Sequence, residues 1–120
     1  TLQLLDLSHN QLKGSLNLEN LPDSLTCAGL FANKFSGSIN LTKLPPGLIV
    51  LNVSDNLLSG SLDLTVLPNS IDELYLGHNG FVGETDFSQL PGALRVFVLD
   101  HTELSGTIVY RAGMNMWWWW

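Results

Sequence analysis

A repeat of constant length constrains this sequence more than any other feature. Asparagine recurs at every 23rd position, at Asn10, Asn33, Asn56 and Asn79. Glycine recurs with the same spacing, at Gly14, Gly37, Gly60, Gly83 and Gly106. A short fixed period is typical of a solenoid, in which each repeat forms one coil and buries its apolar side chains against its neighbours. We therefore predict a solenoid in which each coil consists of one repeat.

The repeat occupies residues 2–110 as five copies, the fifth of them imperfect. We interpret 2–110 as one domain that belongs to a longer array, and we expect the solenoid to end near Tyr110. Residues 111–120 carry no repeat pattern and finish with Trp117 to Trp120, which predicts a non-repeat tail. Tryptophan favours the membrane interface, so a minimal membrane anchor is the functional alternative for this tail.

Alternation of apolar and polar residues predicts the strands. Leu5 and Leu7 alternate with polar neighbours, which indicates a strand over 4–8, with equivalents at 27–31, 50–54, 73–77 and 96–100. Strands from successive repeats can pair in parallel only if the chain between them returns across a second face of the coil. We therefore predict a parallel sheet on the concave face, with the returning segments on the convex side. Leu16 and Leu18 begin a second alternation, which predicts short second strands or 3₁₀ turns on the convex side. The period leaves no room for a helix of three or more turns.

The recurring asparagine lies where the chain leaves each predicted strand. An amide pointing inward there can satisfy backbone groups stranded in the bend, because it offers two donors and an acceptor. Thr102 replaces it in the fifth repeat. We interpret this position as structural and not as a functional site.

The pattern L-x-x-L-x-L-x-x-N-x-L, matched by Leu2, Leu5, Leu7, Asn10 and Leu12, resembles the leucine-rich repeat family. The continuation N-x-L-x-G is similar to extracellular repeats of protist surface proteins and plant receptor-like proteins. The resemblance implies a leucine-rich-repeat solenoid that binds a protein partner on its concave face, within a cell-surface or secreted protein, and that is not an enzyme. Two alternatives stay open: a structural spacer segment, and the ectodomain fragment of a receptor with a catalytic domain elsewhere.

The composition limits the classes of molecule that this chain is expected to bind. Five Lys and Arg against eleven Asp and Glu give a net charge of −6, which leaves no basic patch for nucleic acid. No apolar run approaches the length of a membrane span, so we expect membrane contact only through a parent protein. The single cysteine, Cys27, excludes an internal disulfide and any multi-cysteine zinc site.

The residues at the outward positions of the predicted strands differ from repeat to repeat, whereas the repeated leucine, asparagine and glycine positions are nearly constant. This is the pattern expected of a binding surface on a fixed scaffold. Phe31 and Tyr75 are the best anchors, because aromatic side chains contribute most when a partner desolvates them. Asn52, Glu73 and Asp100 complete the predicted binding set on the concave face. The acidic members favour a basic partner.

Histidine occurs only at His9, His78 and His101, each directly before the asparagine position or its equivalent. His78 and His101 fall on adjacent coils, about 5 Å apart by strand spacing, with Asp100 beside them. A metal site is geometrically conceivable, but two ligands without a fixed third make a weak site, so the sequence assigns no metal and no cofactor. Ser8 precedes His9 without a nucleophile elbow, so no catalytic residue is assigned either.

Two glycosylation sequons occur, at Asn40-Leu41-Thr42 and at Asn52-Val53-Ser54. If the chain is extracellular, Asn40 is the easier of the two to modify, because it is predicted on the convex side. A glycan on Asn52 would shield the predicted binding face.

Overall fold

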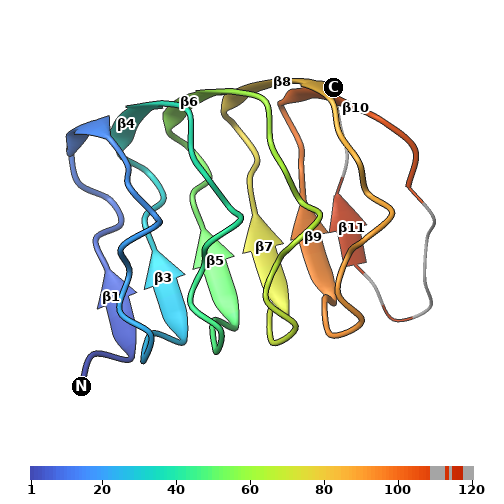
Figure 1. The fold of residues 1–120 in the computed structure, drawn as a ribbon. Coiled ribbons are helices and arrows are strands. Elements are labelled where there is room, and N and C mark those ends of the chain that lie inside the picture. Colours follow the sequence, from blue (N-terminus) through green and yellow to red (C-terminus); the bar gives the residue numbers. More distant parts are fainter. Residues whose placement is uncertain (109–112, 114, 118–120) are drawn as a thin grey trace.

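The polypeptide winds into a solenoid whose coils stack side by side (Figure 1). The computed structural model describes residues 1–108, 113 and 115–117. Each coil gives one strand to a six-stranded parallel sheet, the first sheet: β1 (Leu4–Asp6), β3 (Cys27–Gly29), β5 (Val50–Asn52), β7 (Glu73–Tyr75), β9 (Val96–Val98) and β11 (Asn115–Trp117). The predicted parallel solenoid is confirmed, and no helix occurs in the part of the chain that the structure describes.

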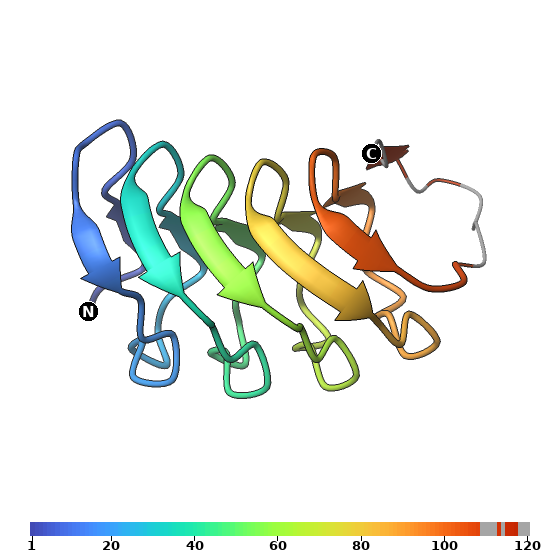
Figure 2. The ribbon, with the colours of Figure 1, turned by 90° about the horizontal axis from the view of Figure 1, so that it is seen from above.

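A second parallel sheet lies across each coil from the first (Figure 2). Its strands are β2 (Lys13–Ser15), β4 (Lys34–Gly37), β6 (Leu57–Gly60), β8 (Gly80–Glu84) and β10 (Glu103–Ser105). We expected the second strands at Leu16 and Leu18, but they form about three residues earlier. The reason is that neighbouring coils already pair one or two residues after the asparagine, as in the bond from the Lys34 amide to the carbonyl of Leu12 in the preceding coil.

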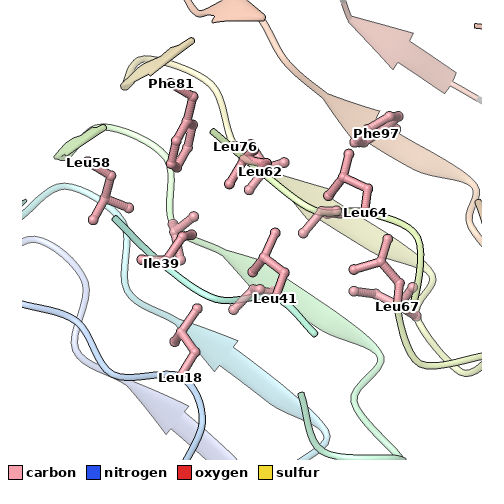
Figure 3. Close-up of a cluster of buried hydrophobic side chains, with 14 of the residues drawn as sticks. Leu18, Ile39, Leu41, Leu58, Leu62, Leu64, Leu67, Leu76, Phe81 and Phe97 are labelled. Atoms are coloured by element: carbon pink, nitrogen blue, oxygen red, sulfur yellow. The ribbon is translucent and has the colours of Figure 1, made fainter. Parts of the chain in front are cut away.

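The apolar side chains of both alternations fill the space between the two sheets (Figure 3). Leu18, Leu41 and Leu64 are buried as predicted, although they lie in extended turns and not in strands. Leu51 and Leu74 occupy the inward positions of β5 and β7. Because each coil alone leaves these side chains half covered, burial depends on the neighbouring coils.

A single turn at the Leu-Pro segment closes each coil. In it, the residue three positions after the proline donates its amide hydrogen to the proline carbonyl, from Leu25 to Pro22 at 3.0 Å and from Leu48 to Pro45 at 3.1 Å. Proline has no amide hydrogen of its own, so it suits the first position of such a turn. The predicted turn is confirmed.

The recurring asparagines join neighbouring coils. Asn56 is buried, and its amide group donates to the carbonyls of Leu30, Val53 and Ser54, while its oxygen accepts from the Phe35 amide. Asn33 and Asn79 repeat the pattern. The inward structural role predicted for this position is confirmed.

The residue before each asparagine has a left-handed backbone. The φ angle lies between 54° and 57° at His9, Ala32, Asp55, His78 and His101. Among residues with side chains, asparagine, aspartate and histidine adopt this conformation several times more readily than most. The backbone therefore explains why four of the five positions hold aspartate or histidine.

The first sheet has one strand more than the five predicted, because β11 pairs with β9. Met116 lies opposite Phe97, 19 positions earlier, whereas elsewhere in this sheet the partners are 23 apart, as with Ala28 and Leu51. Strand pairing uses backbone groups, so it does not require the repeat sequence. The predicted end near Tyr110 and the last three tryptophans, Trp118 to Trp120, lie outside the described residues.

Candidate functional site

The outward side of the first sheet carries the predicted binding residues. In β3, β5, β7 and β9 the middle residue is buried and its two neighbours are half-buried. Asn52, Glu73 and Tyr75 are such neighbours, as predicted. Phe31 and Asp100 lie two residues beyond the ends of β3 and β9, so the prediction that these strands extend to 31 and 100 is wrong. The left-handed residue that follows each of them bends the chain out of the strand.

Phe31 and Asn52 lie together in the wall of a hollow of about 150 Å³. Gly29 also lines the hollow, and a Cβ at this position would lie 3.2 Å from Oδ1 of Asp6. Leu4 borders the hollow with 61% of its surface exposed. The remaining lining residues are Asp6, Cys27, Ala28 and Val50. Sequence reasoning missed the hollow, although a glycine at an outward strand position between apolar neighbours was its signal.

Glu73 and Tyr75 also form one unit. The Tyr75 hydroxyl donates a hydrogen bond of 2.5 Å to Oε1 of Glu73. This bond, with partial burial, raises the pKa of Tyr75 to about 12, because the carboxylate favours the neutral phenol. Tyr75 is therefore uncharged at physiological pH and presents a hydroxyl whose hydrogen is already donated.

An ion pair beside this unit was not predicted. Arg95 donates to both carboxylate oxygens of Asp72, at 2.7 Å each. The hydrogen bonds raise the pKa of Arg95 and lower the pKa of Asp72, so both groups stay charged. The signal in the sequence was their separation by one full repeat, which places opposite charges on adjacent coils.

Asp100 groups with the histidines and not with the other predicted binding residues. Its Oδ2 lies 3.2 Å from Nε2 of His78 and 3.2 Å from Nδ1 of His101. The two imidazole rings are stacked, with centroids 4.1 Å apart. A side chain at Gly77 would occupy the same space as Oδ1 of Asp100, so this glycine is what lets the carboxylate lean over the preceding coil. The sequence predicted that Asp100 lies near the two histidines, but not that its carboxylate points at both rings.

A family model described as Leucine Rich Repeat matches residues 1–30. The two-sheet coil found there continues with the same construction in the later coils. The chain is a leucine-rich repeat protein. No curated protein and no solved structure matches it.

Leucine-rich repeat proteins are in general protein-interaction modules, and the family is typically non-catalytic. Ser8 and Ser54 have local roles in this leucine-rich repeat protein. The Ser8 hydroxyl donates to Oδ1 of Asp6, and the Ser54 hydroxyl donates to Oδ1 of Asn52, each at 2.5 Å. These two bonds use the hydrogens of both hydroxyls. His9 instead packs edge-on against Phe31, with ring centroids 4.9 Å apart.

The side of the leucine-rich repeat protein that carries the closing turns holds a column of asparagine and aspartate. Oδ1 of Asp63 accepts from the amide and the hydroxyl of Thr65, and Asp86 makes the same two bonds with Ser88. The bonds lower the pKa of both aspartates, because they stabilise the charged form. This column stabilises turns.

The two sequon asparagines have different surroundings. Oδ1 of Asn40 accepts from the amide and hydroxyl of Thr42, and its nitrogen donates to Glu19 at 3.3 Å. Asn52 lies in the wall of the hollow, with Oδ1 accepting from Ser54. Glycosylation at either residue stays a prediction. Among the described residues, no helix has the length and apolar character that crossing a membrane requires.

Proposed function

We propose that this leucine-rich repeat protein binds a protein partner through the outward side of its first sheet. The observation that carries the proposal is the pairing, on one face, of an apolar hollow with an acidic and aromatic group two coils away. An apolar hollow accepts an anchoring side chain, and such anchors supply most of the free energy of association. The sequence predicts this face to be concave, which lets a partner touch several coils at once.

The chemistry of the face predicts the chemistry of the partner. An apolar side chain fits against Leu4 and Phe31, which border the hollow. Glu73 and Asp100 add negative charge further along the face and favour basic side chains. Tyr75 adds a half-buried ring beside Glu73. The partner is therefore a protein segment with an apolar anchor followed by basic residues.

Replacing Tyr75 with alanine is expected to weaken binding at least tenfold, or about 1.4 kcal/mol, because the ring is lost from the centre of the contact. The measurement is the affinity of peptides that are selected against the chain from a random displayed library. Increasing salt is also expected to weaken their binding, because charge pairs at the rim are screened.

Asp63→Ala is the matched control, because Asp63 belongs to the turn-stabilising column and not to the proposed face. Thermal melts establish that both variants fold. Loss of binding in Asp63→Ala with unchanged binding in Tyr75→Ala would show that the wrong face has been assigned. Selection that yields no peptide sensitive to Tyr75→Ala favours a spacer segment instead.

We also propose that the parent protein is secreted or lies at the cell surface. The support is the resemblance of the repeat to extracellular families and the presence of two sequons. Asn40 is expected to carry glycan when eukaryotic cells secrete the chain, and Asn52 to carry less, because it is half-buried on the first sheet. Peptide mass mapping with and without glycosidase measures both. An unmodified Asn40 in secreted protein contradicts the expectation.

A further inference from the structure

We propose that His78, Asp100 and His101 form a zinc-binding site that joins the fourth coil, residues 71–93, to the fifth, which begins at residue 94. The proposal does not depend on the function proposed above. It rests on the positions of three ligand atoms, on the scaffold that holds them and on a structural defect at this junction.

The three ligand atoms lie close to the spacing that zinc requires. Metal–ligand bonds of about 2.0 to 2.1 Å in a tetrahedral site place neighbouring ligand atoms about 3.3 Å apart. Oδ2 of Asp100 is 3.2 Å from both Nε2 of His78 and Nδ1 of His101. All three atoms lie within 4.8 Å of one another, so only the distance between the two imidazole nitrogens has to shorten. Because the planes of the two rings lie only 15° apart, one ring also has to turn until both nitrogen lone pairs point at the same ion.

Two imidazoles and one carboxylate are a ligand set that zinc accepts, with water in the fourth position. His78 and His101 have 45% and 63% of their side-chain surface exposed, whereas Asp100 has 20%. An ion and its water can therefore reach the two rings from solvent. The half-buried carboxylate supplies the fixed negative charge.

A second carboxylate lies near the nitrogen of His78 that faces away from Asp100. Oδ1 of Asp55, on the third coil, lies 3.9 Å from Nδ1 of His78, on the side opposite Asp100. A carboxylate that faces the second nitrogen of a ligating histidine orients the ring and increases its basicity. Asp55 is placed to do this after a small approach.

The scaffold positions the ligands before any ion binds. The backbone amide of His78 donates to the carbonyl of Asp100 at 2.8 Å, which holds the two coils together at the site. Buried Asn79 and Thr102 follow the two histidines and anchor the bends. Ligands on such fixed bends lose little freedom when they bind an ion.

The defect is at the same junction. Asn33, Asn56 and Asn79 each donate to a carbonyl of the preceding coil, but Thr102 has one hydroxyl hydrogen and donates it to Leu99 of its own coil. The fourth and fifth coils therefore lack the amide link that joins the earlier pairs. A zinc ion bound by His78 and His101 would supply a link there.

The test titrates Zn²⁺ into the chain, prepared without a histidine tag, by calorimetry. We expect one zinc ion per chain, and at least tenfold weaker binding in each of His78→Asn, His101→Asn and Asp100→Asn. Asparagine is chosen because it tolerates the left-handed backbone at 78 and 101. Zinc is also expected to raise the melting temperature of the unsubstituted chain and not that of these variants.

His9→Asn is the matched control, because His9 has the same left-handed backbone but packs against Phe31. Its zinc affinity is expected to stay within twofold. Gly77→Ala keeps all three ligands but displaces Asp100, so it too should weaken binding. Undiminished binding in both His78→Asn and His101→Asn would overturn the proposal, and so would an equal loss in His9→Asn. Melts without zinc show whether each variant folds. If a variant does not, Co²⁺ added to the unsubstituted chain decides, since a tetrahedral site gives intense visible absorption and its absence contradicts the proposal.

Discussion

Leu51→Ala is expected to lower the free energy of unfolding by roughly 2 to 5 kcal/mol. Leu51 is the inward residue of β5 and has 0% of its surface exposed. The strands β3 and β7 flank it on both sides, so the coils cannot collapse into the cavity that alanine leaves. Denaturant unfolding of the two chains measures the difference.

Leu2→Ala is the matched comparison, because Leu2 is 46% exposed in the first coil and loses little contact on truncation. Its expected cost is below about 1 kcal/mol. Equal losses at Leu2 and Leu51 would contradict a stack in which each coil is stabilised by its neighbours.

Asn56→Ala is expected to cost about 3 kcal/mol, although it removes no apolar surface. The substitution leaves the buried Phe35 amide without its side-chain acceptor. It also removes one of the two side-chain donors from the carbonyls of Leu30 and Val53, which keep their bonds from Asn33 and Asn79. The unpaired Phe35 amide carries the full cost of its lost hydration, and each carbonyl that loses one of its two donors adds a smaller cost. Chemical denaturation followed by circular dichroism measures the loss.

Two further substitutions separate this explanation from a general effect of side-chain size. Asn10→Ala should cost less than about 1 kcal/mol, because the bonds of Asn10 to Leu7 and Ser8 are exposed to water. Asn56→Thr should fall between the two, because Thr102 shows that threonine keeps one bond, to Leu99. If Asn56→Thr and Asn56→Ala cost the same, the hydrogen-bond account is wrong.

The sequence predicted the first sheet well, because a repeat of constant length brings equivalent positions side by side. Leu51 lies opposite Leu74, as the repeat requires. The second sheet could not be placed in the same way. Lys13 pairs with Lys34, which is 21 positions later and not 23, so the two faces of the coil are offset by two residues. Alternation of apolar residues does not encode that offset.

The sequence predicted which residues lie on the candidate binding face, but not which of them contact one another. Phe31 and Tyr75 were found because aromatic residues stand out among outward positions. The hollow over Gly29 and the carboxylate that leans over Gly77 depend on the absence of a side chain one coil away. A glycine at an outward position marks where such a space can form, but the lateral packing of the coils decides what occupies it. The pairing of Asp72 with Arg95 was the exception, since its spacing equals the repeat.

The threonine at position 102 also changes the kind of interaction that resists separation of the fourth and fifth coils under load. A solenoid pulled along its axis opens first at the junction with the fewest links between coils. Thr102 leaves the Leu76 carbonyl without the amide donor that Leu7, Leu30 and Val53 receive from the following coil. The ion pair of Asp72 with Arg95 and the contact of His78 with Asp100 cross this junction instead, so charged side chains hold it where the amide bond is missing. The force that separates these two coils should therefore fall with added salt, which screens charge pairs, more than the force that separates the coils joined by Asn33 or Asn56.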